Sequence, residues 1–501
     1  MMRLLLISLG IILLAGIFPG GCGQETPEQD NDLKDPVKIE SGYISGTIIG
    51  EPGSEVHVYR GIPYAAPPVG ELRWKPPQSP AAWTGIRECT VTGTQAPQAP
   101  GLLPAPVATG EDCLWLNVLT PAKQTTDKLP VMVWMHGGAY SIDTAANPTY
   151  NNYKLPQHGV VQVNVNMRLG VMGLLAHPLL SGESPNGVSG NYMFLDMIAA
   201  LKWVQKNIGA FGGDPGNVTI FGYSGGSWKV ISLMASPLAK GLFHKAICQS
   251  GTPTGTYVVN PRPLPEIEAL GEKVFARLGV DKEADPLAAA RALPWEKIIE
   301  ADSAVAMETG GPYEIWGIWD LALDGWFMPE SPLEIFQAGK QNDVDFIMGG
   351  NRGEITGPGM ILMPGIIPDY VKMLTSADKA GAKGYAYIFD QLPGNWKRDG
   401  CVSCHAMETI YMFGNVDMPR EWALVGFLAS QSGAKSTDPG ATDADRKVAE
   451  NMMSMWAQFA RTGDPSVKDL VEWPAYEAAA DRYLYITETL EVKSGFSKVG
   501  Q

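Results

Sequence analysis

The sequence is short of positive charge. Its 38 lysine and arginine residues face 53 aspartate and glutamate residues, which gives a formal net charge of −15 at pH 7. A protein this acidic repels phosphate backbones, so we expect no nucleic-acid partner. The same charge disfavours contact between the folded part and anionic membrane surfaces. The hydrophobic content of 45% is nevertheless that of a globular protein with a large core.

Long apolar runs are also scarce. Behind the short basic start Met1-Met2-Arg3, the stretch Leu4 to Phe18 is apolar apart from Ser8 and two glycines. This stretch is short for a membrane span and typical of the core of a signal peptide. We therefore expect residues 1–22 to be a signal peptide.

Cys22 follows small residues and resembles the acylated cysteine of a bacterial lipoprotein, although Pro19 stands where such signals usually have leucine. Simple secretion and an uncleaved anchor are the alternatives. Residues 23–36 are polar and acidic, which is typical of a disordered tether. We expect an exported protein, periplasmic or on the surface of a bacterium or else secreted, that meets a membrane only through a lipid on Cys22.

Cysteine and histidine are rare, with six of each. Export implies an oxidising compartment, in which cysteines tend to pair. If Cys22 is lipidated, the remaining five allow two disulfides and one free thiol. These five are Cys89, Cys113, Cys248, Cys401 and Cys404.

No internal repeat or long low-complexity run follows the tether, and strand-like runs alternate with helical periods. Apolar residues recur at helical spacing from Phe194 to Ile208 and from Val448 to Phe459, the latter after the capping pattern Thr442-x-x-Asp445. Buried strands interleaved with helices predict an α/β fold, with a mostly parallel sheet covered on both faces. The runs that predict strands are 131–135, 160–165, 218–221, 245–248, 346–348 and 385–389.

The segment Gly222-Tyr223-Ser224-Gly225-Gly226 directly follows one of these strand-like runs. It has the Gly-x-Ser-x-Gly pattern of a sharp strand-to-helix turn that pushes a serine hydroxyl out of the sheet. The pentapeptide by itself could also be an ordinary glycine-rich loop. Its context favours the first interpretation.

The surrounding segments resemble those of the type-B carboxylesterases, the group of α/β-hydrolases that includes bacterial para-nitrobenzyl esterases and the cholinesterases. The resemblance spans residues 37 to 490 and implies one α/β-hydrolase domain at 37–501, with helical excursions above the active site. Independently of it, the segment 261–338 is helix-rich with many prolines and tryptophans, which indicates an excursion above the sheet rather than a separate domain. The resemblance further implies hydrolysis of small-molecule esters without a metal or organic cofactor. The matching segments, in chain order, are 60–70, 111–118, 134–140, 166–170, 211–215, 222–226, 236–244 and 459–465.

The resemblance implies a catalytic triad in the order serine, acid, histidine. Ser224 is the expected nucleophile, Glu354 the acid and His405 the base, because each lies in a segment that resembles the family's own. Gly353 replaces the aspartate that usually precedes the acid. For Glu354 taken alone, the alternative is a solvated loop carboxylate.

The resemblance also implies an oxyanion hole made of the backbone N–H groups of Gly138, Ala139 and Gly225, where small residues let substrate approach. Ala139 replaces a frequent glycine and Gly225 a frequent alanine. Ser250 matches a family serine that helps to orient the acid. Tyr223 replaces the glutamate that often precedes the nucleophile, which we expect to affect buried hydrogen bonding more than chemistry.

The cysteines allow several pairings. The resemblance implies a disulfide between Cys89 and Cys113. For Cys401 and Cys404 we expect a short disulfide that holds the loop before His405. The alternatives are unpaired thiols or other pairings, and a covalent haem site of the Cys-x-x-Cys-His pattern. Haem would make His405 an iron ligand rather than a base.

The spacing of the acid and base is short. Glu354 precedes His405 by 51 residues, about half the family's usual distance, which predicts an open site that accepts bulky esters. A catalytically silent binding protein on the same fold is the alternative function, and hydrolysis of a chromogenic ester would separate the two. Candidate pocket residues, with a place in the core as the equal alternative for each, are Tyr140, Trp228, Trp316, Trp319, Met360 and Phe413.

Overall fold

The computed structural model describes residues 31–99, 105–252, 260–309, 318–356, 365–418 and 423–500. The expected signal peptide with Cys22, most of the expected tether, Trp316 and Met360 lie outside the described residues. The dominant feature is an 11-stranded sheet, beside a three-stranded and a two-stranded one. The block from β15 to β8 is parallel, whereas β16 at one edge and β6, β4 and β3 at the other pair antiparallel.

The strands of the large sheet, in spatial order, are β16 (Leu490–Ser494), β15 (Arg482–Ile486), β14 (Gly384–Phe389), β13 (Asp345–Asn351), β10 (Lys245–Gln249), β9 (Gly213–Tyr223), β7 (Leu129–Met135), β8 (Val161–Val165), β6 (Trp115–Thr120), β4 (Val56–Pro63) and β3 (Thr47–Ile49). The small sheets are formed by β1 (Val37–Ile39), β2 (Gly42–Ser45) and β5 (Ile86–Glu88), and by β11 (Arg262–Pro263) and β12 (Ala322–Leu323).

The large sheet has a hydrophobic core on each face. Alternate residues of β7 divide between them: Val131, Val133 and Met135 belong to one core, and Met132 and Trp134 to the other. Side chains of a strand point to opposite faces in turn, and every one of these five is buried. A parallel strand covered on both faces has no solvent side, which explains why the run is continuously apolar.

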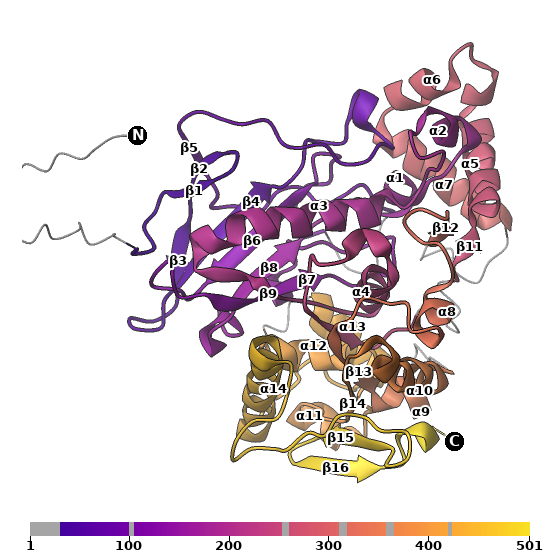
Figure 1. Ribbon diagram of the computed structural model, residues 1–501. Coiled ribbons are helices and arrows are strands. Elements are labelled where there is room, and N and C mark those ends of the chain that lie inside the picture. The colour runs from indigo at the N-terminus through magenta and orange to yellow at the C-terminus, as the bar shows by residue number, and fades with distance from the viewer. Residues whose placement is uncertain are drawn as a thin grey trace, which may run out of the picture.

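The helices cover these two faces. Helices α3 and α4 pack into the first core, and α12, α13 and α14 into the second. In Figure 1, α5, α6 and α7 stand together on the side of the molecule away from β3. The α-helices are α1 (Gly170–Leu174), α2 (Pro178–Glu183), α3 (Tyr192–Asn207), α4 (Gly225–Ala235), α5 (Leu264–Leu278), α6 (Pro286–Ala292), α7 (Trp295–Thr309), α8 (Pro332–Gln337), α9 (Arg352–Thr356), α10 (Ile366–Ser376), α11 (Gly394–Arg398), α12 (Met407–Met412), α13 (Ala423–Ser432) and α14 (Asp443–Thr462).

The predicted strands and helices are confirmed. Each of the six apolar runs forms a strand of the parallel block, and the two helical periods form α3 and α14. The capping pattern before α14 is a reciprocal capping box between Thr442 and Asp445. The excursion holds α5, α6, α7 and α8.

The described residues lack two kinds of feature. None of their helices is both long and apolar enough to cross a membrane. They also contain no group of three or more histidine, cysteine, aspartate or glutamate side chains placed to hold a metal ion.

Candidate active site

The expected site residues meet at one edge of the sheet. Neighbouring parallel strands β7, β9, β10, β13 and β14 end at this edge, and the chain after each strand supplies part of the site. Ligand sites of open parallel sheets form beyond these carboxyl ends. The parts, in chain order, are the segment Gly138–Ala139 after β7, Ser224 after β9, Ser250 after β10, Glu354 after β13 and His405 after β14 and α11.

Ser224 forms a tight turn between β9 and α4. Its backbone has φ 54° and ψ −124°, a region that side chains with a Cβ rarely adopt. The turn is possible because the glycines around it have no side chain: a Cβ on Gly222 or Gly226 would lie 2.6 or 2.1 Å from the carbonyl oxygen of Met135. The Gly-x-Ser-x-Gly segment is therefore a strained strand-to-helix turn, as predicted.

The backbone N–H groups expected to form the oxyanion hole point to no backbone acceptor among the described residues. Gly138 and Ala139 are not donors in any turn or loop hydrogen bond, and Gly225 is the first residue of α4, where an N–H has no acceptor within the helix. Both residues before Tyr140 have positive φ, 78° for Gly138 and 53° for Ala139. A Cβ on Gly225 would lie 2.0 Å from the oxygen of Ala139, so glycine is required where the family often has alanine.

The expected acid and the expected base are in direct contact. His405 Nδ1 lies 2.5 Å from Glu354 Oε2, and the two side chains are 5% and 0% exposed. The other carboxylate oxygen of Glu354 accepts the N–H of Asn351 at 2.7 Å. A buried carboxylate that accepts at both oxygens is well satisfied. Glu354 is thus a buried partner of His405 rather than a solvated loop residue.

Ser250 is linked to Glu354 through Asn351. Its hydroxyl donates to Glu408 at 2.5 Å and accepts from the side chain of Asn351 at 3.2 Å, and Asn351 in turn holds Glu354. Burial, followed by the nearby Glu354 carboxylate, raises the pKa of Glu408 to about 7. Sequence reasoning assigned Glu408 no role, although it lies three residues after His405 in the segment that resembles the family's.

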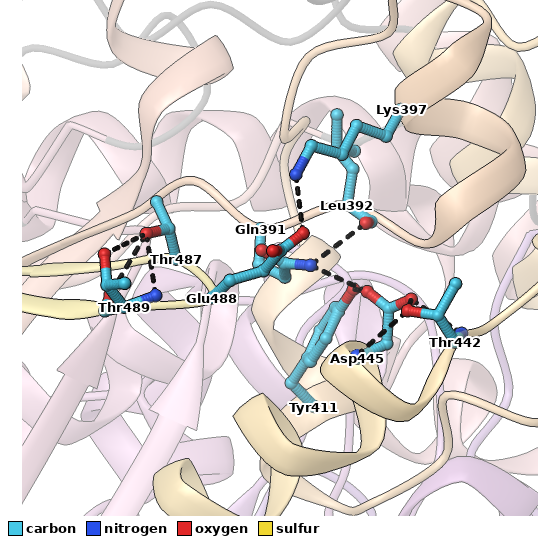
Figure 2. A network of polar contacts seen from close by, with 9 residues as sticks. All are labelled: Gln391, Leu392, Lys397, Tyr411, Thr442, Asp445, Thr487, Glu488 and Thr489. Carbon is cyan, nitrogen blue, oxygen red and sulfur yellow. Dashed lines mark hydrogen bonds and ion pairs between the residues drawn. The ribbon is translucent and has the colours of Figure 1, made fainter.

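The helix after the base is fastened from its other end. Asp445, fully buried at the start of α14, accepts from Gln391 at 2.8 Å and from Tyr411 on α12 at 2.9 Å. Figure 2 shows these contacts. Thr442 donates to the same carboxylate at 2.7 Å. Because α12 begins two residues after His405, the network that holds α12 also fixes the backbone next to His405.

The expected disulfide between Cys401 and Cys404 is absent, and this expectation was wrong. Both residues are free thiols, and both side chains face α13. Cys404 Sγ lies 3.6 Å from the carbonyl oxygen of Leu428, and Cys401 interacts with Ser432. Burial raises the pKa of both thiols, so neither is a reactive thiolate.

The segment 401–405 is instead held against α9. Gly353 donates its N–H to the carbonyl oxygen of Ser403 at 2.9 Å, and a Cβ on Gly353 would lie 2.7 Å from that oxygen. The glycine that replaces the family's aspartate therefore permits this close approach.

The expected disulfide between Cys89 and Cys113 is likewise absent, since both are free and buried. Their thiols have different neighbours, with Asp35 and Arg87 near Cys89 and Arg168 and Asp196 near Cys113. Burial raises the pKa of Cys89 to about 11. The family's usual partner position holds alanine here, and a cysteine seven residues upstream does not replace it.

Several candidate pocket residues turn out to be core. Phe413 packs edge-on against Trp134 in the second core, and Trp319 donates to Asp302 at 2.7 Å. Tyr140 and Trp228 pack edge to face with ring centroids 5.8 Å apart, and both are at most 2% exposed. These four side chains are packed in the interior and are not evidence for the position of the substrate pocket.

Tyr223 lies between the Trp134 side chain and His405. Its ring stacks on Trp134 at 5.9 Å and lies 6.1 Å from the His405 ring. Ser224 itself is 9% exposed, and no hydrogen bond joins its hydroxyl to His405 within the described parts of the chain. In ligand-free enzymes such a contact is often long and tightens only when substrate binds.

The comparisons with known proteins agree with this geometry. The profile of the carboxylesterase family matches residues 34–367 and 366–499. The chain is 34% identical over 492 residues to a fumonisin B1 esterase of Sphingopyxis macrogoltabida, covering 88% of this chain and 85% of that protein. It is 31% identical over 506 residues to the para-nitrobenzyl esterase of Bacillus subtilis (strain 168), covering 91% and 96%.

Solved structures give the same result. A structure of PNB esterase superposes with a TM-score of 0.76 at 28% identity, covering 91% of this chain and 96% of that one. The sheet order, the turn at Ser224 and these relatives point in one direction. The chain therefore belongs to the carboxylesterase family of α/β-hydrolases and is an enzyme that hydrolyses carboxylic esters.

Proposed function

We propose that ester hydrolysis proceeds through an acyl-enzyme on Ser224, with His405 as general base and Glu354 as the acid that orients it. The observation that carries this proposal is the 2.5 Å contact between His405 Nδ1 and the buried Glu354, at the same sheet edge as the strained Ser224 turn. A carboxylate at Nδ1 keeps the proton on that nitrogen and leaves Nε2 free to accept one.

The reaction then has two halves. His405 Nε2 takes the proton of Ser224 as its oxygen attacks the ester carbonyl, and the N–H groups of Gly138, Ala139 and Gly225 receive the negative charge on the carbonyl oxygen. The tetrahedral intermediate expels the alcohol, which takes the proton from His405. Water then attacks the acyl-enzyme with His405 again as base, releasing the carboxylic acid and restoring Ser224.

The test compares Ser224, which precedes α4, with Ser232 inside that helix. Ser224→Ala should lower kcat on a chromogenic short-chain ester by about 10⁴-fold or more. Ser232→Ala, whose hydroxyl donates to the carbonyl oxygen of Trp228 at 2.8 Å within α4, should keep most of the activity. A fluorophosphonate should add once to the wild type and not to Ser224→Ala, as read by intact mass. Substantial hydrolysis by purified Ser224→Ala would refute the triad.

We propose further that the site accepts bulky esters, because the chain between Glu354 and His405 is short. A panel of esters with acyl and alcohol groups of increasing size should show kcat/KM maintained for the larger members. A steep fall beyond short acyl chains would refute this proposal and leave the triad untouched.

We also propose export with a lipid on Cys22, supported by the apolar stretch and the small residues before that cysteine. Full-length protein expressed in a bacterium should partition with membranes and incorporate labelled palmitate. Cys22→Ala should abolish the label. Wild-type protein that is unlabelled and wholly soluble would refute lipidation.

A further inference from the structure

A lysine lies fully buried one turn after the nucleophile. Lys229 on α4 is 0% exposed, although lysine is rarely buried without a partner. Arg168, which is 2% exposed, has its charge balanced by Asp196 at 2.6 Å. Among the described residues, no carboxylate lies within ion-pair distance of Lys229. The catalytic scheme above gives this lysine no role.

The ammonium group of Lys229 instead holds the loop that carries the expected oxyanion hole. Its Nζ donates to the carbonyl oxygen of His136 at 3.0 Å and to that of Gly137 at 3.4 Å. Both contacts are buried, and these two residues directly precede Gly138 and Ala139. Lys229 thus joins the helix of the nucleophile to the loop after β7.

The second contact has a chemical consequence. The carbonyl of Gly137 and the N–H of Gly138 belong to the same peptide group. A cation that donates to the carbonyl oxygen draws electrons from that peptide group and makes its N–H a stronger donor. The N–H of Gly138 is one of the groups expected to bind the oxyanion.

We propose that Lys229 is a positioning residue for ester hydrolysis, which holds the Gly137–Ala139 loop in place and polarises the Gly138 N–H toward the developing oxyanion. The inference rests on the proposed function, because it gives Lys229 a part in the same oxyanion hole. No proton leaves Lys229 during turnover. Its charge stabilises the transition state more than the ground state, because the carbonyl oxygen of the ester is nearly neutral before serine attacks it.

The surroundings of Lys229 make this contribution sensitive to pH. Burial lowers the pKa of Lys229 to about 7, and the buried Asp143 opposes this shift. Burial raises the pKa of Asp143, which also accepts from Tyr150 at 2.8 Å. Burial, and then the charge of Lys229, hold the pKa of His136 well below its usual range, so His136 stays neutral. The charged donor is therefore lost as the pH rises above about 7.

The first test uses the wild-type enzyme alone. With saturating 1-naphthyl acetate, kcat should fall by about tenfold or more as the pH rises from 7 to 9.5, because Lys229 loses its charge. A kcat that stays level over this range, together with a wild-type kcat in Lys229→Met, would overturn the inference.

The second test uses Lys229→Met, which keeps the length of the side chain and removes its charge and donor. We expect kcat to fall by about 10- to 100-fold at pH 6.5, with KM changed by less than about threefold and no remaining fall at alkaline pH. The matched control is Lys245→Met, which removes another buried lysine at the opposite end of the parallel strands. Lys245→Met should keep the wild-type kcat and pH profile.

The outcomes separate this inference from the proposed function. If Ser224→Ala is inactive but Lys229→Met retains wild-type kcat and its alkaline fall, only the role of Lys229 is refuted. If Lys229→Met does not fold, the wild-type pH profile decides. If Ser224→Ala remains active, the proposed function fails first. A merely structural role for Lys229 would lower the amount of folded enzyme and leave the pH profile unchanged.

Discussion

The turn that carries Ser224 and the loop that carries His405 lie at the same edge of the sheet and are held by different means. At Ser224 the backbone itself is constrained, since glycines at 222, 225 and 226 pass so close to neighbouring carbonyls that no Cβ would fit. At His405 the constraint comes from side chains: Glu354 contacts the imidazole, and the Ser250 hydroxyl and the Asn351 amide both donate to the nearby Glu408.

The difference decides which positions tolerate substitution on each side. A backbone turn that needs glycine leaves a fixed pattern in the sequence, and the Ser224 segment keeps that pattern. A side-chain network tolerates exchange as long as its hydrogen bonds are satisfied. The acid segment has accordingly lost its usual aspartate to Gly353, and the closer approach of Ser403 occupies the space.

Among changes to the groups that hold these two residues in place, the largest expected effect is at Glu354. Glu354→Gln keeps the shape but replaces an acceptor of the His405 Nδ1 proton by an amide, which favours the wrong tautomer. We expect kcat to fall by about 10³- to 10⁴-fold while the melting temperature changes little. Activity on a chromogenic ester and a thermal melt measure the two quantities. A loss smaller than tenfold would mean that Glu354 does not orient the base.

The next largest effect is expected from a substitution in the turn that carries Ser224. Gly226→Ala would place a Cβ 2.1 Å from the carbonyl oxygen of Met135, so we expect unfolding to become easier by about 3 kcal/mol, with activity lost in proportion to folded protein. The matched control is Gly182→Ala in the exposed part of α2, where a Cβ meets nothing within 4 Å. That variant should be neutral or gain about 0.5–1 kcal/mol. Equal stability of the two variants in urea unfolding would contradict the close-packing argument.

A smaller effect is expected at Glu408. Because the pKa of Glu408 is raised to about 7 in the folded state, the folded protein binds its proton more tightly than the unfolded chain does. This contribution to stability is complete below about pH 4.5 and is lost as the pH rises through about 7. Glu408→Gln should remove this fall in stability with rising pH. It should lower kcat by less than tenfold, which corresponds to less than about 1.4 kcal/mol in activation free energy. Urea unfolding of the wild type and of Glu408→Gln at pH 5 and 7.5 measures how the free energy of unfolding changes with pH. The same change in both proteins would argue against a raised pKa of Glu408.

The smallest expected effect is that of reductant. Since the five described cysteines are free, dithiothreitol should change neither the melting temperature nor kcat. Peptide mass spectrometry without reduction should find Cys401 and Cys404 unlinked. A cross-linked peptide, or a melting temperature lowered by reductant, would show that the thiols pair in solution.

Much of the fold and of the site could be predicted from the sequence. Apolar runs of strand length located the strands of the parallel block, and the pattern Gly-x-Ser-x-Gly located the nucleophile turn, because each depends on a local rule of periodicity or backbone geometry. The pairing of Glu354 with His405 followed from resemblance and is borne out as a contact. The prediction of two disulfides was wrong, because pairing depends on where the thiols point, and spacing in the sequence does not reveal this.

The sequence by itself determined the alternation of strands and helices, the position of the glycine-dependent turn and the acidic charge, all of which depend on neighbouring residues or on composition. Only the tertiary structure decided which distant groups meet. It turned Cys401 and Cys404 toward α13, brought Asn351 and Ser250 to Glu408, and placed Lys229 under the carbonyls of His136 and Gly137. A buried lysine looks like any other lysine in the sequence, because its burial and its partners arise from the packing of α4 against the end of β7.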